Sequence, residues 1–401
     1  MKPARVKRLA LETTQGHAGE LLRESQFVTR YSDEAVGRRE LALSLSMPPR
    51  PEGYRGSLIP PVLAMNLPEG FLLDLVVSRY RKAMDINDDM NLLALTSTPT
   101  TGRIWARHDG ATTARDSQPM ALRDILAAPG TEKLFDELVE RYALNAAIAG
   151  VQPKVVVPEA RAKLRASPVG EKSQLHAPDL IVKSGGEFHG IAENEFLCMS
   201  MARAAGIEVP EFWLSEDGNL FVIRRFDRAP DGGYLGFEDM ACLTGRHPRD
   251  KYDAGYFHVA RAIADFCAPA HKIESLERFF RQLVFCCLIR NGDAHLKNWG
   301  LLYSDPKAAD EDARLSPAYD LICTPVWIAG DTLALGLGGT KAWPGRESLE
   351  EFGRKHCDMR SPGQLIDEVV ERAMTYRPDS VTPMWKAIRR EVALSAKLLT
   401  P

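Results

Sequence analysis

The sequence lacks an apolar run long enough to span a membrane, an excess of positive charge and a Cys-x-x-C pair. Basic side chains are frequent among the first eight residues, but no apolar segment follows them, so we expect neither a signal peptide nor a membrane span. The formal net charge of −3 argues against nucleic-acid binding through a global basic field. The seven cysteines are odd in number and most have apolar neighbours, so we expect reduced thiols in a cytoplasmic protein.

The 401 residues suffice for two or three lobes, each with its own core. Residues 6–104 are expected to form a small α+β unit, with a half-buried strand over 41–47 and a helix after 66–70. Nothing in this unit has catalytic spacing, so we interpret it as a structural or docking module. The polar stretch 107–119 is expected to be a linker.

A candidate phosphate loop follows a helix expected over 131–148. Its glycine precedes the apolar run 155–157, and a glycine before a strand lets backbone N–H groups approach a phosphate closely. An ordinary turn would fit the same residues. The candidate loop contains Gly150, Val151, Gln152 and Lys154.

Lys183 ends a short strand expected over 179–183, in the position of a strand lysine that binds nucleotide phosphates. A helix expected over 192–205 begins with Glu193 and Glu195. Either glutamate could pair with Lys183, or both could simply favour the positive end of the helix dipole.

A hairpin is expected after this helix, because Asp217-Gly218 separates two apolar runs. Its second strand leads into residues 224–228. The backbone there could bind an adenine, as the hinge of a kinase does.

Residues 291–298 read Asn-Gly-Asp-Ala-His-Leu-Lys-Asn and follow a run that predicts a buried helix over 276–289. Apolar residues return after this segment, and a short polar loop between two buried segments is typical of a rigid catalytic loop. Asp293 and Asn298 have the D-x-x-x-x-N spacing of a kinase catalytic loop, in which Asp is the base and Asn binds Mg²⁺.

Two further charges fit the same chemistry. Lys297 can lie against the transferring phosphoryl group, and Asp320 could complete the metal site. Phosphoryl transfer depends on positioning and on cations, because charge is spread over the equatorial oxygens. The D-x-x-x-x-N spacing alone is weak evidence, since a solvated turn can contain it by chance.

These segments together resemble the HipA family of bacterial serine/threonine kinases, the toxins of type II toxin–antitoxin pairs. The resemblance covers almost the whole chain and implies an α+β, two-lobed protein-kinase-like fold with an extra N-terminal α+β subdomain and a mostly helical C-terminal lobe. The implied domains are 1–125, 126–235 and 236–401. The segments that carry the resemblance are 66–70, 149–154, 225–228, 291–298 and Tyr319-Asp320.

The resemblance also implies ATP and Mg²⁺ as cofactors. Asp293 would be the catalytic base with Lys297 beside it, and Asn298 and Asp320 would hold Mg²⁺. The nucleotide would contact the phosphate loop, the strand lysine, the hinge and the catalytic segments, through Gly150, Val151, Gln152, Lys154, Lys183, Arg224, Phe226, His295 and Tyr319.

The implied partners are a small helix-turn-helix (HipB-like) antitoxin and a protein substrate such as an aminoacyl-tRNA synthetase. DNA would be contacted only through the antitoxin complex, and no membrane is involved. One alternative is a kinase-like phosphotransferase with another acceptor. Another is a pseudokinase that binds an antitoxin and helps to repress its operon. The full set Lys183, Asp293, Asn298 and Asp320 favours an active enzyme.

Three residues depart from the family pattern. Ala147 stands where family members phosphorylate a serine, so inactivation by that route is not expected here. Arg224 replaces the usual glutamate at the hinge, which matters little if only its carbonyl is used. Arg290 replaces a small residue ahead of the catalytic segment and could crowd the site.

Overall fold

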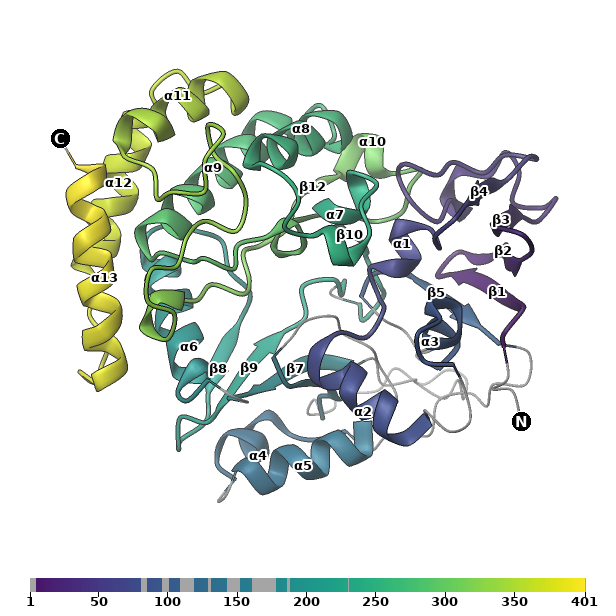
Figure 1. The fold of residues 1–401 in the computed structure, drawn as a ribbon, viewed down its shortest axis with the longest axis horizontal. Coiled ribbons are helices and arrows are strands. Elements are labelled where there is room, and N and C mark those ends of the chain that lie inside the picture. Colours follow the sequence, from purple (N-terminus) through teal and green to yellow (C-terminus); the bar gives the residue numbers. More distant parts are fainter. Residues whose placement is uncertain are drawn as a thin grey trace.

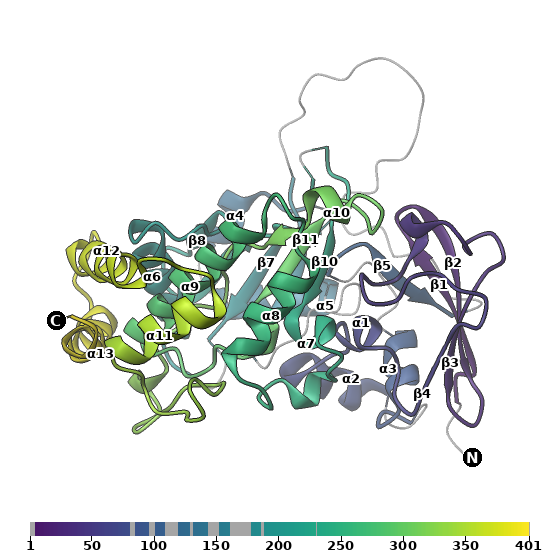
Figure 2. The same ribbon diagram turned by 90° about the horizontal axis from the view of Figure 1, so that it is seen from above.

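The computed structural model describes residues 5–80, 85–95, 101–108, 119–128, 131–142, 152–160, 178–185, 188–229 and 231–400. Within these ranges no helix is both long and apolar enough to cross a membrane. The chain forms an elongated molecule with an antiparallel sheet at one end, a second sheet in the middle and a helical part at the other end (Figures 1 and 2).

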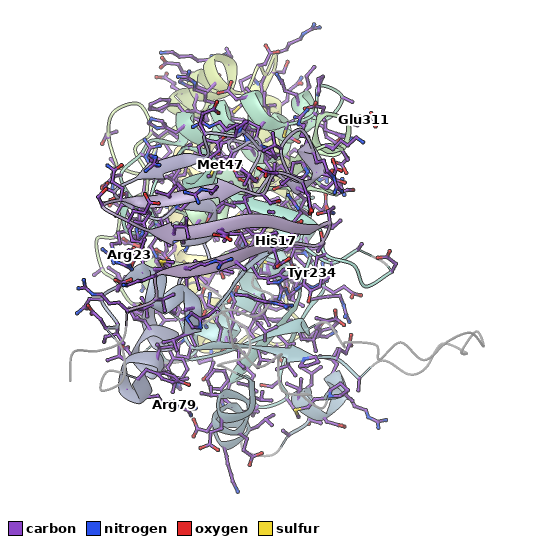
Figure 3. The ribbon with its side chains drawn as sticks, turned by 90° about the vertical axis from the view of Figure 1, so that its right-hand side faces the viewer. His17, Arg23, Met47, Arg79, Tyr234 and Glu311 are labelled. Carbon is purple, nitrogen blue, oxygen red and sulfur yellow. The ribbon has the colours of Figure 1, made fainter. Side chains whose placement is uncertain are left out.

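The N-terminal unit is a five-stranded antiparallel sheet with three helices on its buried face, as the α+β prediction requires. The strand order is β4-β3-β2-β1-β5. The strands are β1 (Arg8–Thr13), β2 (Gly16–Arg23), β3 (Phe27–Tyr31), β4 (Tyr54–Gly56) and β5 (Ile104–Arg107). The helices are α1 (Pro61–Ala64), α2 (Gly70–Tyr80) and α3 (Asp89–Leu95). Figure 3 looks onto this sheet, with His17 and Arg23 near the two ends of β2.

The strand predicted over residues 41–47 is wrong. The segment begins at the end of a 3-10 helix, η1 (Arg39–Leu41), and continues as a tight turn. Its backbone groups bond to side chains instead of to a neighbouring strand. The Tyr31 hydroxyl donates to the Met47 carbonyl at 2.6 Å, and the Glu238 carboxylate accepts the Leu45 N–H at 2.8 Å. These long-range hydrogen-bond partners override the local alternation of apolar residues.

The middle sheet has four antiparallel strands in the order β6-β7-β9-β8. They are β6 (Lys154–Pro158), β7 (Pro178–Ser184), β8 (Phe212–Leu214) and β9 (Leu220–Arg224). The predicted hairpin is confirmed, since β8 pairs with β9 across Asp217-Gly218. Helix α6 (Ile191–Ala204) covers one face of the sheet. The other face packs against α4 (Leu122–Leu126), α5 (Thr131–Tyr142) and α2 of the N-terminal unit.

The C-terminal part is built around α9 (Lys272–Leu288), which is buried from Phe279 onward except for one residue. A small antiparallel sheet joins β10 (Gly236–Asp239), β11 (Gly300–Tyr303) and β12 (Arg314–Leu315). The other helices are α7 (Met240–Leu243), α8 (Tyr256–Phe266), α10 (Ala309–Asp312), α11 (Arg346–His356), α12 (Pro362–Thr375) and α13 (Pro383–Leu399). Short 3-10 turns occur at η2 (Pro248–Asp250), η3 (Leu296–Asn298) and η4 (Thr324–Val326).

Two buried carboxylates join the N-terminal unit to the rest of the chain. Glu238 has no exposed surface and accepts hydrogen bonds from Ser44 Oγ at 2.5 Å and Tyr303 Oη at 2.6 Å. Asp227 accepts the Gly102 N–H at 2.7 Å and a bidentate pair of bonds from Arg225 at 2.9 and 2.7 Å. A buried carboxylate is costly unless it is fully hydrogen-bonded, so these contacts define how the parts dock.

Leu283 on α9 is fully buried, and we expect Leu283→Ala to lower the free energy of unfolding by about 2–5 kcal/mol through lost burial and a cavity. Chemical denaturation monitored by circular dichroism measures this. Ile273→Ala on the same helix is the matched control, because Ile273 is 70% exposed and should cost little. Equal losses for the two variants would contradict the buried position of Leu283.

Candidate active site

The segment 291–298 is fixed by its own amide side chains. Asn291 Nδ2 donates to the Asp320 carbonyl at 3.1 Å, and Asn291 Oδ1 accepts the Asp293 N–H at 3.1 Å. Asn298 Oδ1 accepts the His295 N–H at 3.0 Å. Both asparagines are buried. The segment thus forms a loop held by hydrogen bonds, and its first asparagine ties it to the segment that carries Asp320.

Gly292 is required by close packing. Its N–H donates to Thr324 Oγ1 at 2.9 Å, and a Cβ at this position would lie 1.9 Å from Asp331 Oδ2. Any larger residue would push the loop away from this neighbour. Gly292 thus allows the loop to lie against residues 324–331.

A buried lysine joins the middle sheet to the C-terminal part. Lys183 Nζ on β7 donates to Glu195 Oε1 of α6 at 2.6 Å and also to Asp320 Oδ1. Of the two glutamates that could pair with Lys183, the structure therefore selects Glu195. Asp320 has a left-handed backbone with φ of 54°, which few residues other than Gly, Asn and Asp adopt readily.

Lys183 and Asp320 stabilise each other's charged form, whereas burial raises the pKa of Glu195 to about 7 although Lys183 opposes the rise. Burial alone would lower the pKa of Lys183, but the carboxylates of Asp320 and Glu195 raise it above its ordinary value. Burial alone would raise the pKa of Asp320, but the cations of Lys183 and Lys154 lower it. Lys183 is therefore an ammonium and Asp320 a carboxylate at neutral pH.

Lys154 lies beside Lys183, because the two residues are direct partners in the antiparallel pairing of β6 and β7. Burial lowers the pKa of Lys154; the Asp320 carboxylate opposes this effect, while Lys183 adds to it. Gln152 Nε2 donates to the Ser184 carbonyl at 3.0 Å and so holds the segment before β6 against β7. Gly150, Val151 and Ala147 lie outside the described residues.

His295 is a neutral imidazole. Burial, and then the charges of Lys251 and Lys297, lower its pKa to about 3. Its Nδ1 is buried and has no hydrogen-bond partner within the described part of the chain. A neutral imidazole with a free ring nitrogen can donate to or accept from a ligand without adding charge.

Lys297 has a partner that sequence reasoning missed. Its Nζ donates to Glu69 Oε1, and Glu69 Oε2 accepts from Lys251 Nζ at 3.1 Å. Glu69 immediately precedes α2 in the N-terminal unit, so that unit contributes a carboxylate to the loop 291–298. Residues 66–70 stood out in the sequence, but nothing there indicated which distant lysines the glutamate would meet.

Asp293 lies near the loop surface and accepts a 2.6 Å hydrogen bond from the Tyr252 hydroxyl. Burial raises the pKa of Asp293, an effect that the Tyr252 hydrogen bond and the Lys251 cation oppose. Sequence reasoning also missed Tyr252. Its only signal was its place beside Lys251 in a polar turn.

An aromatic cluster lies next to this charged region. The rings of Phe226 and Tyr319 are 5.2 Å apart, and the rings of Phe226 and Phe237 are 5.5 Å apart. The Tyr319 hydroxyl donates to the Lys297 carbonyl at 2.7 Å. The Arg224 side chain forms ion pairs with Glu159 and Glu211, each at 2.5 Å.

The prediction that Arg290 could crowd the site is wrong. Its guanidinium is directed to α13, where Nε donates to Ser395 Oγ at 3.0 Å and Nη1 donates to Glu391 Oε2 at 3.2 Å. The left-handed backbone of Arg290, with φ of 53°, ends the turn after α9 and sends the side chain to this partner. Arg290 thus ties the last helix to the start of the loop 291–298.

Asn298 and Asp320 alone are too few to hold Mg²⁺, so a metal there would need further oxygens from a bound ligand and from water. No group of three or more His, Cys, Asp or Glu side chains suited to a metal occurs in the described ranges. Mg²⁺ commonly binds through one or two protein ligands, water and substrate phosphates. Asn298 and Asp320 match that pattern, and their segments are held together by the hydrogen bond from Asn291 to the Asp320 carbonyl.

Comparison with known proteins identifies the family. The family model described as the HipA-like C-terminal domain matches residues 146–376, and the HipA N-terminal domain matches residues 9–107. The chain belongs to the HipA family. The matched ranges include Lys183, Glu195, Asp320, the loop 291–298 and, except for Arg8, all of β1 to β5.

Two curated relatives come from Sinorhizobium fredii. "Putative kinase Y4dM" is 34% identical over 230 residues, 53% of this chain and 52% of the relative. "Putative kinase Y4mE" is 28% identical over 228 residues, 52% of this chain and 50% of the relative. The aligned region thus spans about half the length of these relatives.

A solved structure confirms the fold. A chain of the Shewanella oneidensis toxin–antitoxin complex of HipA, HipB and operator DNA superposes with a TM-score of 0.67 at 17% identity, over 98% of this chain and 96% of that chain. The predicted HipA-like, two-lobed α+β architecture is therefore present.

We expect Glu69→Gln to destabilise the protein, because it leaves two largely buried ammonium groups without their carboxylate. The loss should lie between about 1 kcal/mol, typical of exposed pairs, and about 3–5 kcal/mol, typical of fully buried pairs. Chemical denaturation measures it. Glu24→Gln is the matched control, since Glu24 pairs with Arg55 at 3.3 Å and both side chains are exposed. Equal, small losses would contradict the bridging role.

The effect should depend on pH with a defined sign. The lysines hold the pKa of Glu69 below its ordinary value despite burial, so its stabilisation is full above the unfolded pKa of about 4.3 and is lost as the pH falls below it. The difference between wild type and Glu69→Gln should therefore shrink at acidic pH. A constant difference from pH 7 to pH 3 would contradict this assignment.

Proposed function

We propose that this HipA-family protein is a Mg²⁺-ATP-dependent serine/threonine protein kinase that acts as a growth-inhibiting toxin. The observation that carries the proposal is the buried contact of Lys183 with both Glu195 and Asp320, next to the loop that presents Asp293 and Asn298. Such an arrangement gathers a phosphate-binding cation, its orienting carboxylate, metal ligands and a base in one place.

The nucleotide phosphates would lie at the ends of β6 and β7. Lys183 and Lys154 would bind phosphate oxygens, with His295 as an uncharged hydrogen-bonding partner. Gly150, Val151 and Gln152 would form the phosphate loop. Asn298 and Asp320 would hold Mg²⁺, which when bound neutralises charge on the phosphates and orients them.

The adenine and ribose would lie beside the aromatic cluster. Arg224 and Phe226 would contribute hinge backbone, because the Arg224 side chain is occupied by glutamates. Tyr319 would line the ribose side. With the domains proposed from sequence, 1–125, 126–235 and 236–401, this nucleotide site would lie between the second and the third.

Asp293 would accept the proton of the acceptor hydroxyl. Its raised pKa suits a general base better than that of a fully solvated aspartate. Lys297 would act beside it only after its ammonium group leaves the Glu69 carboxylate and contacts a phosphate oxygen.

The proposed partners follow from family membership. They are a small helix-turn-helix antitoxin and a protein substrate such as an aminoacyl-tRNA synthetase, with DNA contacted through the antitoxin complex. The Shewanella oneidensis complex, which contains HipA, HipB and operator DNA, supports this setting.

We expect Asp293→Asn to leave the fold and ATP binding nearly intact while phosphoryl transfer falls by roughly 10²–10⁴-fold, the usual effect of losing a general base. Growth after induced expression and transfer of labelled phosphate to cell proteins measure the change. Asp310→Asn, which disrupts an exposed ion pair with Arg39, is the control and should behave like wild type. An Asp293→Asn protein as toxic as wild type would separate toxicity from phosphoryl transfer.

A further inference from the structure

Tyr252 lies at the surface beside the catalytic loop, with 38% of the residue exposed. Its hydroxyl donates to Asp293 Oδ1 at 2.6 Å, and its ring packs edge-on against the His295 ring with 5.1 Å between centroids. Among the described residues no other group donates a hydrogen bond to the Asp293 carboxylate. A surface hydroxyl thus reaches one oxygen of the carboxylate that the proposed reaction would use as its base.

We propose that the Tyr252 hydroxyl occupies the acceptor-hydroxyl position of the free protein and must leave before an acceptor binds. This inference rests on the proposed role of Asp293 as general base. An acceptor alcohol must donate its O–H to that base at about 2.6–3.2 Å. The phenol of Tyr252 makes the same type of bond at 2.6 Å, so it matches the acceptor in both chemistry and distance.

Tyr252 can leave by rotation of its side chain alone. The backbone on either side is anchored, since the Lys251 carbonyl accepts the Leu296 N–H at 3.2 Å and the Tyr252 carbonyl accepts from Lys341 Nζ at 3.4 Å. Exposed side chains change rotamer within picoseconds to nanoseconds. The acceptor position can therefore open while the catalytic loop keeps its geometry.

The consequence is protection of ATP from water. In hydrolysis a water oxygen bonds to the γ-phosphorus, the bond from that phosphorus to the ADP oxygen breaks, and the water proton passes to Asp293. The Tyr252 hydroxyl already engages the carboxylate oxygen that would take this proton. A water molecule competes poorly for it, whereas a bound protein acceptor supplies further contacts that offset loss of the tyrosine hydrogen bond.

The test is the rate of Mg²⁺-ATP hydrolysis by the full chain with no protein acceptor added. Tyr252→Phe keeps the ring against His295 and removes only the hydroxyl. We expect it to raise hydrolysis by roughly 10-fold or more, the size of a hydrogen bond to a charged group. Tyr252→Ala should also raise the rate.

Tyr256→Phe is the matched control. The Tyr256 hydroxyl donates to the Ala294 carbonyl at 3.2 Å, so this variant loses a hydrogen bond to the same loop but none to the base. No rise in hydrolysis is expected from it.

Phosphate found on Tyr252 of the wild type by mass spectrometry would also support the proposal, because it requires the phenol to lie in the acceptor position.

The remaining outcomes overturn the proposal. A Tyr252→Phe rate equal to or below that of wild type means that the hydroxyl does not block the acceptor position. A rise of similar size in Tyr256→Phe means that loosening of the loop is the cause. ATP binding is followed in parallel by thermal shift. Binding without hydrolysis in every variant overturns this inference alone, whereas absence of binding overturns the proposed function and this inference with it.

Discussion

The site depends on one buried cation. Lys183 is enclosed by Glu195 of α6 and by Asp320, which follows the small sheet of the C-terminal part. Removing a charge of this kind from water costs several kcal/mol, and only close opposite charges offset that cost. Because the three residues come from β7, from α6 and from the C-terminal part, their contact fixes the middle sheet relative to the loop 291–298. Misplacement of any one would leave a buried charge unpaired.

The N-terminal unit takes part in the same charge network. Glu69 connects it to Lys297 and Lys251, and α2 packs on the middle sheet beside α4 and α5. The unit was interpreted from the sequence as a structural or docking module, and its packing fits the first of these. Its carboxylate, however, also determines where two lysines of the candidate site point. A change in how this unit docks would therefore alter the contacts of Lys297 and Lys251.

Sequence reasoning succeeded where the necessary partners are close along the chain. The hairpin at Asp217-Gly218, helix α9 and the loop after it follow from local turn chemistry and periodicity. It failed at 41–47. The apolar residues there alternate as in a strand, but the backbone bonds to the distant side chains of Tyr31 and Glu238 instead of to a neighbouring strand. Partner choices across long separations, such as that of Glu69 for Lys297, depend on packing that no local pattern encodes. The choice between Glu193 and Glu195 was settled in the same way, by the packing of α6.

We propose that Lys183, Asn298 and Asp320 form a Mg²⁺-dependent ATP site. Thermal unfolding of the wild type and of Asp320→Asn, with ATP and with or without Mg²⁺, can decide whether they do. Asn tolerates the left-handed backbone of residue 320 but is a poorer Mg²⁺ ligand. We predict that wild type is stabilised increasingly as ATP rises, as linkage requires, and that the Mg²⁺-dependent part is lost in Asp320→Asn. No stabilisation of folded wild type by millimolar Mg²⁺-ATP would contradict the claim.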